Sequence, residues 1–315
     1  MRLIDADALA DTLDPLTLVE AMRAAHRADG PGAVERLLLE EKGGANSALT
    51  WIAWDRARGV AVKTATVVPA NSATGALPNI HSVVVLFDGA DGRPLAAIHG
   101  ESFTRMKTAA DSALGCDLLA RRDAATLAVL GAGAQAGTHI RFLRAVRPLL
   151  ARVLIWNRTA ARAERLAARL RDEGVTASAV AAPEHAVREA DVVACLTASD
   201  APVLQGAQLK AGAHVDLVGG FTPAMREADD EAVRRARLFA DTLRFTLADC
   251  GDYADPIARG IIEASAVEGD LFALCSGRSQ GRRSAEDITL FKNGGGGHLD
   301  LIVARALYAI AAGGA

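Results

Sequence analysis

An apolar strand that runs directly into a glycine-rich turn constrains the fold of this chain more than any other feature. Residues 127–136 read Leu-Ala-Val-Leu-Gly-Ala-Gly-Ala-Gln-Ala, which ends in the pattern G-x-G-x-x-A. In a doubly wound fold Gly131 permits the tight turn, Gly133 lets the backbone approach a pyrophosphate, and Ala136 keeps the next helix close to the strand. The pattern therefore predicts a dinucleotide site, with a glycine turn that serves packing alone as the alternative.

From residue 126 onward, predicted strands alternate with predicted helices. The strands are Thr126–Leu130, Val153–Trp156, Thr176–Val180, Val192–Leu196, His214–Leu217, Leu238–Ala240 and Ile288–Phe291. The helices between them include Gln135–Val146, Thr159–Glu173 and Asp230–Arg237. This order of short apolar strands and helices is typical of an α/β fold with a Rossmann-type doubly wound parallel sheet. Ala134 and Gln135 lie where the first helix directs its N–H groups at the phosphates.

The chain before residue 120 has a different character. Asp14-Pro15 predicts the start of a helix that runs to about Ala28. Four runs of β-branched and apolar residues then predict an antiparallel or mixed sheet: Ala48–Trp54, Val60–Val68, His81–Asp88 and Leu95–His99. A predicted helix over Ser102–Ala120 follows. A glycine-rich loop, Asn293–Gly297, and an apolar helix, His298–Ile310, close the chain. These elements predict a smaller α+β domain.

Composition and charge exclude several classes of function. The net charge of −3 at pH 7 argues against a nucleic-acid partner, which needs a basic surface. No apolar run approaches the roughly 20 residues of a membrane span, and acids interrupt the apolar residues near the N-terminus, so we expect a cytoplasmic protein without a membrane partner. The four cysteines form no C-x-x-C pair and are expected to be buried thiols, and the scattered histidines predict no metal site.

Further motifs join the glycine turn in a fixed order. They are Lys63 followed by Pro69, Asn71 and Gly75, Gly92 with Pro94, the stretch Thr104–Ala110, the loop Gly219–Glu227, and Phe291-Lys292-Asn293 leading to Asp300. In this order and spacing the chain resembles the ornithine cyclodeaminase/mu-crystallin family over nearly its whole length. The resemblance implies a substrate-binding domain, residues 1–118 with 298–315, that forms a homodimer. It also implies a dinucleotide-binding domain over residues 119–297.

Lys63 is the residue that the resemblance places at the reacting nitrogen. It lies in an otherwise uncharged strand, and from the residues alone a lysine on a solvent-facing side of that strand is the favoured interpretation. The resemblance instead implies an active-site lysine, which burial would suit to acid or base work because desolvation disfavours its charged form. Arg36 matches the family's arginine for the substrate carboxylate. It lies in a weakly patterned stretch, where a surface arginine is an equal alternative.

Two residues depart from the family pattern. The family usually reads R-T-A/G-A where this chain reads Lys107-Thr108-Ala109-Ala110. Because lysine is a point charge and arginine a planar fork, we expect Lys107 to bind a carboxylate or other anion less rigidly, with an exposed helix lysine as the alternative. Cyclodeaminase itself carries an aspartate where this chain has Phe221. Phenylalanine cannot exchange a proton, so cyclisation of a side-chain amine is disfavoured, and Phe221 is expected to line an apolar substrate pocket.

The choice of cofactor depends on the residues after the second strand of the parallel sheet. An acid there would hold the adenosine ribose and select NAD(H). This chain has Asn157, Arg158 and Thr159 instead. Arg158 can pair with a 2′-phosphate, and its two neighbours can donate hydrogen bonds to it. We therefore favour NADP(H) over NAD(H), with a mere helix cap at Thr159 as the alternative.

Three more residues are assigned by position. The resemblance places Thr197, at the end of a strand, near the nicotinamide, and a helix cap is the other explanation. Asn79 matches a position where the family has a substrate-contacting threonine. Asp300 either caps the final helix or approaches the nicotinamide pocket.

Together these residues predict an NAD(P)H-dependent oxidoreductase that acts on the C–N bond of an amino acid or cyclic imino acid. The hydride would pass to or from the α-carbon, and Lys63 would move the proton at the nitrogen. Two other functions stay open. One is a cyclodeaminase-type lyase that uses NAD as an internal hydride relay, against which Phe221 argues. The other is a non-enzymatic, NADP(H)-dependent binder of a small molecule, like mu-crystallin.

Overall fold

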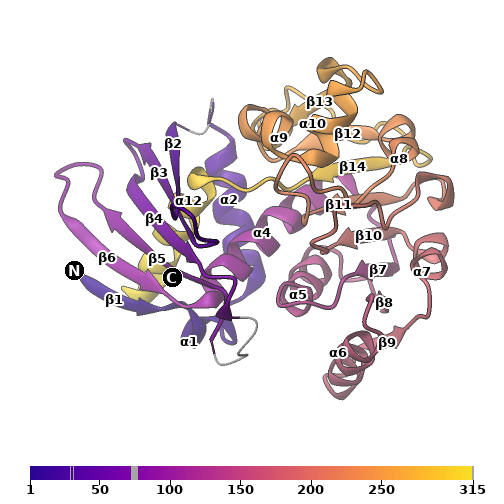
Figure 1. Cartoon of the computed structure of the whole chain (residues 1–315), viewed down its shortest axis with the longest axis horizontal. Helices are drawn as coiled ribbons and strands as arrows, with labels where there is room; N and C mark the ends of the chain where they lie inside the picture. The colour runs from indigo at the N-terminus through magenta and orange to yellow at the C-terminus, as the bar shows by residue number, and fades with distance from the viewer. Residues whose placement is uncertain (29, 31, 72–76, 314–315) are drawn as a thin grey trace. The chain divides into compact units, whose positions relative to one another are not determined.

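The computed structural model describes residues 1–28, 30, 32–71 and 77–313, so the motif residue Gly75 lies outside the described residues. The chain divides into two compact units, each with its own sheet (Figure 1). The first unit consists of Met1–Lys107 and Gly296–Ala315, and the second of Thr108–Gly295. The second unit is therefore inserted into the first along the sequence.

A six-stranded mixed sheet forms the centre of the first unit. In spatial order its strands are β1 (Arg2–Asp5), β6 (Pro94–His99), β5 (Ile80–Phe87), β4 (Gly59–Val67), β3 (Ser47–Asp55) and β2 (Ala33–Glu40). β1 runs parallel to β6, and the other neighbouring pairs are antiparallel. On β5, Val84 and Leu86 are buried whereas Val83 is exposed. Because side chains alternate between the faces of a strand, one face of the sheet holds the core.

Helices cover that face. α12 (Gly297–Ala311) packs on β3, β4 and β5 and beside α2 (Pro15–His26) (Figure 1). α2 begins where the sequence predicts, because Asp14 Oδ1 accepts a hydrogen bond from the N–H of Leu16. α1 (Ala6–Ala10) and the start of α4 (Glu101–Leu119) complete this α+β unit.

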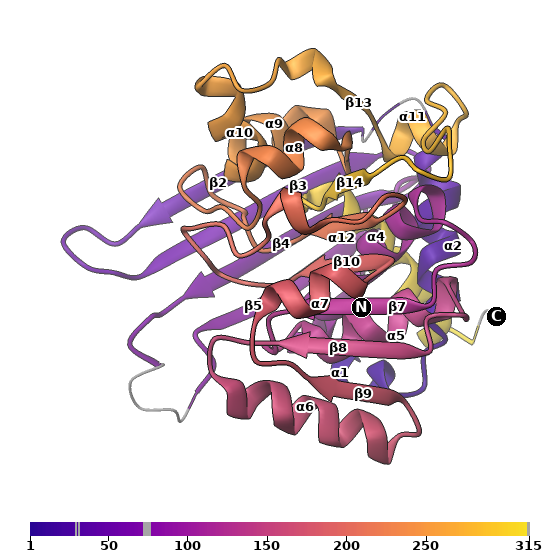
Figure 2. The ribbon, with the colours of Figure 1, turned by 90° about the vertical axis from the view of Figure 1, so that its right-hand side faces the viewer.

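An eight-stranded parallel sheet forms the centre of the second unit. In spatial order its strands are β13 (Val267–Asp270), β12 (Arg237–Ala240), β14 (Thr289–Lys292), β11 (His214–Leu217), β10 (Val192–Cys195), β7 (Thr126–Leu130), β8 (Arg152–Trp156) and β9 (Thr176–Ala179). Figure 2 shows β8, β7 and β10 side by side. The strand order reverses between β7 and β10, and such a switch point is where doubly wound folds bind ligands.

Helices cover both faces of this sheet. They are α5 (Ala136–Val146), α6 (Ala160–Asp172), α7 (Pro183–Glu189), α8 (Asp230–Arg235), α9 (Leu243–Asp249), α10 (Gly251–Ala258) and α11 (Leu271–Cys275), with short 3₁₀ turns at Gly206–Gln208 and Ala264–Ala266. Leu127 and Val129 of β7 pack against α5 and α6, whereas Ala128 and Leu130 pack in a second core with α7 and α8. Burial on both faces explains why this strand is apolar throughout, and the predicted fold class is confirmed.

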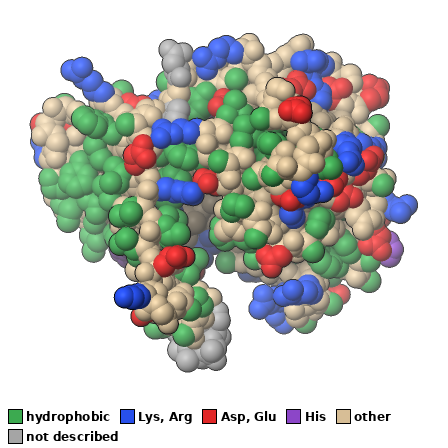
Figure 3. Space-filling view, turned by 45° about the horizontal axis from the view of Figure 1, so that its top comes forward, with side chains coloured by type: hydrophobic (Ala, Val, Ile, Leu, Met, Phe, Trp, Pro, Cys, Tyr) green, Lys and Arg blue, Asp and Glu red, His purple; other side chains and the backbone are tan. Residues whose placement is uncertain are grey.

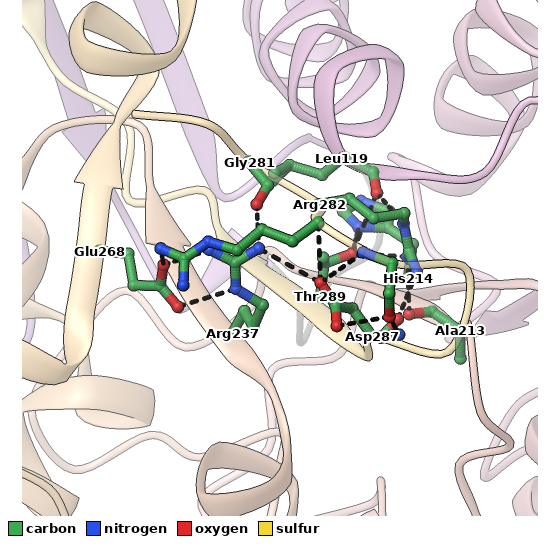
Figure 4. A network of polar contacts seen from close by, with 11 residues as sticks. Leu119, Ala213, His214, Arg237, Glu268, Gly281, Arg282, Asp287 and Thr289 are labelled. Atoms are coloured by element: carbon green, nitrogen blue, oxygen red, sulfur yellow. Dashed lines mark hydrogen bonds and ion pairs between the residues drawn. The ribbon is translucent and has the colours of Figure 1, made fainter. Parts of the chain in front are cut away.

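A polar network holds the amino-terminal edge of the parallel sheet together (Figure 4). Arg237, the first residue of β12, is paired with Glu268 of β13. Thr289, the first residue of β14, accepts a hydrogen bond from Arg282 (3.0 Å) and is bonded to His214 of β11 (3.0 Å). Arg237, Thr289 and His214 are the first residues of their strands, whereas the glycine turn follows the end of β7. The network therefore stabilises the edge of the sheet opposite that turn.

The structure corrects the predicted elements at several places. β1, α1, β2 and β13 were not predicted. The stretch around Arg36, which is weakly patterned in sequence, is the edge strand β2. Leu37, Leu38 and Leu39 on it are all exposed, so no alternation of burial marks it as a strand. β14 begins at Thr289, one residue later than predicted.

The division of the chain also differs from the predicted boundary after residue 118. It falls between Lys107 and Thr108, inside α4, because the later part of that helix, including Cys116, packs in a core of the second unit. Within the described ranges, no helix has both the length and the apolar character that a membrane span requires.

Candidate active site and cofactor site

The turn after β7 has the geometry that its glycines suggest. Gly131 has a φ of +112°, and a Cβ atom there would lie 2.6 Å from the carbonyl oxygen of Leu196, so the turn requires glycine. Gly133 and Ala134 are exposed, and among the described residues the space beside Gly133 is open. Ala136 is fully buried at the start of α5. A ligand can therefore approach the backbone of this turn closely.

A cavity of about 420 Å³ lies against the turn. It is lined by Ala132, Gly133, Ala134 and Leu166 and by three arginines of α6, Arg162, Arg165 and Arg169. A Cβ atom on Gly137, in the first turn of α5, would lie 2.8 Å from the guanidinium of Arg169. Gln135 is the N-cap residue of α5. The helix N-terminus suits the pyrophosphate of a dinucleotide, and the three cations of α6 suit a further phosphate group at the same cavity.

Asn157 connects this turn with the loop after β8. Its Oδ1 accepts a hydrogen bond from the N–H of Ala132 (2.9 Å), and its Nδ2 donates to the carbonyl oxygen of Thr159 (3.0 Å). Thr159 is the N-cap residue of α6, as the alternative interpretation expected, but its side chain makes no capping hydrogen bond in the described structure. Arg158 is exposed beside it.

Lys63 is buried and does not face solvent. Its side chain is 10% exposed, and Nζ donates to Thr104 Oγ1 on α4 (3.1 Å) and to Asp300 Oδ1 on α12 (3.3 Å). Nζ lies 5.6 Å from the centre of the Phe103 ring. The surface-lysine interpretation is therefore wrong, and three segments far apart in the sequence meet at this amine.

Lys107 belongs to the same cluster. Its Nζ lies 3.5 Å from Asp300 Oδ1, and its side chain is as buried as that of Lys63, so the exposed-lysine alternative is wrong. Asp300 is not the cap of α12, whose N-cap residue is Gly296. It lies in the first turn with its carboxylate in contact with both lysines. Two ammonium groups against one carboxylate give the cluster a positive charge, which suits an anionic substrate.

The environment of Lys63 changes its proton affinity. Desolvation lowers the pKa of Lys63 below its usual value, the carboxylate of Asp300 opposes that shift, and Lys107 adds to it. Lys63 therefore gives up its proton more readily than a lysine in water, which is what a general acid requires.

Arg36 points to the same face of the sheet as Lys63. The strand register pairs Arg36 with Trp51 and Trp51 with Lys63, and directly paired residues project to one face. Two strand spacings separate them, which is about 10 Å. The exposed guanidinium of Arg36 lies over the Trp51 ring, 5.7 Å from its centre. A small molecule bound at Lys63 is within reach of this group.

The other predicted site residues lie elsewhere. Asn79 precedes β5, five residues before Val84, the partner of Lys63 in the register. That separation is about 17 Å along the strand, so the structure does not bring Asn79 to the lysine cluster. Phe221 is 60% exposed on the second unit. Thr197 caps no helix, because its hydroxyl donates to Glu227 Oε1 (2.8 Å).

Glu227 is buried, and the sequence analysis included it only as the end of the motif loop Gly219–Glu227, without a role. Burial raises the pKa of Glu227 to about 7, although Lys292 opposes the shift. The available signal was a carboxylate in the loop that follows the apolar strand His214–Leu217.

Comparison with known proteins identifies the family. The sequence model of the ornithine cyclodeaminase/mu-crystallin family matches residues 53–314. The chain belongs to this family. A curated relative, the Delta(1)-pyrroline-2-carboxylate reductase of Paracoccus denitrificans, is 42% identical over 261 residues, which cover 83% of this chain and 82% of that protein.

Two solved structures share the fold over almost the whole chain. The Delta(1)-pyrroline-2-carboxylate reductase of Thermococcus litoralis, in complex with NADH and L-proline, matches with a TM-score of 0.92 at 27% identity and covers 99% of this chain and 98% of that one. The iminosuccinate reductase of Paracoccus denitrificans, in complex with NAD⁺, matches with a TM-score of 0.88 at 30% identity and covers 100% and 98%. The predicted membership of the ornithine cyclodeaminase/mu-crystallin family is thus confirmed.

Proposed function

We propose that this chain is a nicotinamide-dependent reductase of C=N bonds whose substrate is a small cyclic imino acid. The observation that carries the proposal is the buried Lys63, in contact with Thr104 and with Asp300, whose carboxylate also contacts Lys107. Relatives that are 30% identical or more include pyrroline-2-carboxylate and iminosuccinate reductases, which reduce imines that carry a carboxylate.

Residues of the first unit have distinct roles toward the substrate. Lys107, and Arg36 from the edge strand, hold the carboxylate. Lys63 donates a proton to the imine nitrogen, which makes the carbon more electrophilic. Asp300 keeps both lysines in place. The cofactor, when bound at the glycine turn of the second unit, supplies the hydride.

A panel assay tests this function. Purified protein is mixed with NADPH or NADH and a series of cyclic ketimine carboxylates, and with keto acids plus ammonia. We expect loss of the reduced-nicotinamide absorbance with at least one cyclic ketimine. Release of ammonia and proline from ornithine without net oxidation of the cofactor would establish the lyase instead. Tight binding of ligands without turnover of any of them would favour a binding protein.

For the cofactor we propose a preference for NADP(H) over NAD(H). No acid follows β8, and Arg158 and the hydroxyl of Thr159 are exposed at the place where such an acid would hold the ribose. Arg162, Arg165 and Arg169 of α6 add positive charge at the same cavity. The solved relatives described above hold NADH or NAD⁺, so this preference rests on the residues of this chain.

Substitution of Lys107 tests the binding of the carboxylate. We expect Lys107→Gln to raise the KM for the imino acid about tenfold, because one charge-assisted hydrogen bond to the carboxylate is lost, while kcat changes much less. Steady-state kinetics at saturating cofactor measures both constants. Lys210→Gln, which alters a lysine of the second unit that is paired with Asp191, is the control. A lower kcat with an unchanged KM would contradict this role.

We further propose that the chain forms a homodimer through the open face of the first sheet. Leu39 on β2, Ile52 and Trp54 on β3 and Val83 on β5 are exposed on the face opposite Lys63, and Figure 3 shows hydrophobic side chains gathered on the surface of this unit. Exposed large apolar side chains on an open sheet face are typical of an interface. We also propose a location in the cytoplasm. The four cysteines are free thiols, three of them buried, as expected in a reducing compartment.

Light scattering of an Ile52→Glu variant tests the dimer. In a two-fold interface the new charge meets an apolar surface on both copies, so we expect the dissociation constant to rise by about tenfold to 100-fold. Leu149→Glu places the same charge on an exposed leucine of the second unit and should leave the mass unchanged. A wild type that is monomeric at micromolar concentration would refute the proposal.

A further inference from the structure

A single carboxylate joins the ends of two neighbouring strands in the second unit. Glu227 is fully buried, and its Oε1 accepts hydrogen bonds from the N–H (2.6 Å) and the hydroxyl (2.8 Å) of Thr197, just after β10. Its Oε2 accepts from the N–H groups of Val218 (2.9 Å) and Gly219 (2.5 Å), directly after β11. Four donors from two strand ends therefore converge on one side chain.

The strand register places these donors next to the glycine turn. Leu130, Cys195 and Leu217, the last residues of β7, β10 and β11, are paired in register. The carboxyl ends of the three strands thus form one edge, where Gly131 lies against the carbonyl group of Leu196. A dinucleotide crosses such an edge at the switch point. Its adenosine half lies toward β8, so its nicotinamide half lies over β10 and β11.

A buried ion pair fixes the position of Glu227. Asp252 Oδ1 accepts hydrogen bonds from the N–H groups of Glu227 (2.7 Å) and Ala228 (3.2 Å). Asp252 Oδ2 lies 3.3 Å from Nζ of Lys292, which is entirely buried on β14. Nζ of Lys292 in turn donates to the carbonyl oxygen of Leu217 (3.1 Å) at the end of β11. Lys292 and Glu227 therefore both bind the backbone at the end of β11. A shift of the Glu227 carboxylate would break these buried polar contacts.

The loop after β11 fits closely around this network. A Cβ atom on Gly219 would lie 1.6 Å from the carbonyl oxygen of Thr197 and 2.7 Å from Glu227 Oε1. A Cβ atom on Gly220 would lie 2.3 Å from Asp252 Oδ2. Both positions therefore require glycine, because any side chain would push the strand ends apart.

We infer that Glu227 is a positioning residue for the nicotinamide half of the cofactor. It holds Thr197 and the turn at Gly219 in one fixed arrangement, and the ring lies against that surface during hydride transfer. The inference rests on the proposed function, since it takes a nicotinamide cofactor as the ligand of this edge. A carboxylate suits the task because both of its oxygens only accept hydrogen bonds. A glutamine would turn an NH₂ group toward two of the four donors.

The test compares binding of the whole cofactor with binding of its adenosine half. Wild type and Glu227→Gln are titrated by calorimetry with NADPH and with 2′-phospho-ADP-ribose, which lacks the nicotinamide, and in parallel with NADH and ADP-ribose. Glu268→Gln is the matched control. It removes a carboxylate from the polar network at the opposite edge of the sheet (Figure 4).

We expect Glu227→Gln to weaken binding of the intact cofactor about tenfold or more, with the fragment unchanged within about twofold. It should also lower kcat without raising the KM for the imino acid. Glu268→Gln should change none of these quantities. Equal weakening of cofactor and fragment, or no change in either, overturns the inference.

Thr197→Val covers the case in which Glu227→Gln does not fold. It removes one of the four donors and keeps the three backbone ones, and we expect it to weaken the intact cofactor about threefold to tenfold and to spare the fragment. An unchanged ratio of the two affinities overturns the inference. A wild type that binds NADPH but reduces no imino acid refutes the proposed reaction alone. A wild type that reduces imino acids while Glu227→Gln keeps full cofactor affinity and kcat refutes the positioning role alone.

Discussion

Lys63→Gln is expected to lower kcat for imine reduction by about 10²- to 10⁴-fold, the range that a positioned general acid contributes. Glutamine keeps a hydrogen-bond donor near Thr104 and Asp300 but has no proton to give at neutral pH. The KM for the cofactor should change much less, because the glycine turn proposed to bind it is left intact. Steady-state and single-turnover kinetics measure the loss.

The pH dependence gives this prediction a second readout. Reduction needs the protonated amine, so kcat/KM should fall as the pH rises through the pKa of Lys63, which burial lowers below its usual value. Lys63→Gln should abolish that fall. Lys42→Gln, which alters an exposed lysine of the same unit, should reproduce the wild-type profile. A Lys63→Gln variant with near wild-type kcat would refute a catalytic role for Lys63.

The double variant Arg158→Ala/Arg162→Ala is expected to lower kcat/KM with NADPH by about 10²- to 10³-fold and with NADH by less than about threefold. Two charge-assisted hydrogen bonds to the 2′-phosphate are lost, each worth about 1.5–3 kcal/mol, and NADH has no such group to lose. Kinetics with both cofactors at fixed imino acid measures the ratio.

Arg171→Ala is the control for this substitution. Arg171 lies near the end of α6, and its guanidinium donates to the carbonyl oxygen of Ala177 (3.0 Å), so its loss should affect both cofactors alike. A wild type that prefers NADH, or a double variant that loses both cofactors equally, would contradict the assignment of the 2′-phosphate site.

Local patterns were enough to predict seven of the eight strands in the sheet of the second unit. The turn at Gly131 and the helices Ala136–Val146 and Ala160–Asp172 match the predicted elements within about one residue, because strand, turn and helix are consecutive in the chain. The edge strand Ala33–Glu40 was missed because it has no such local pattern. Its outward leucines are exposed in the chain as described, so neither alternation nor burial distinguishes them from a loop.

The lysine cluster could be proposed only by resemblance. Lys63 and Asp300 are 237 positions apart, and no periodicity relates them, so burial of the amine and its carboxylate partner became visible only in the fold. The arginines of α6 were not recognised as site residues for a different reason. Arg162, Arg165 and Arg169 look like an ordinary solvated helix face until the cavity at the glycine turn is seen beside them.

The interrupted arrangement of the first unit has a consequence for biosynthesis. Its last helix, α12, supplies Asp300 and packs on strands made near the beginning of the chain, whereas Thr108–Gly295 forms a separate body between them. During translation the inserted body can fold first, while the early strands gain their contacts with α12 only after that helix has left the ribosome. A nascent chain that has not yet reached α12 would therefore lack the carboxylate partner of its amine, and it would gain that partner only after Asp300 has been made.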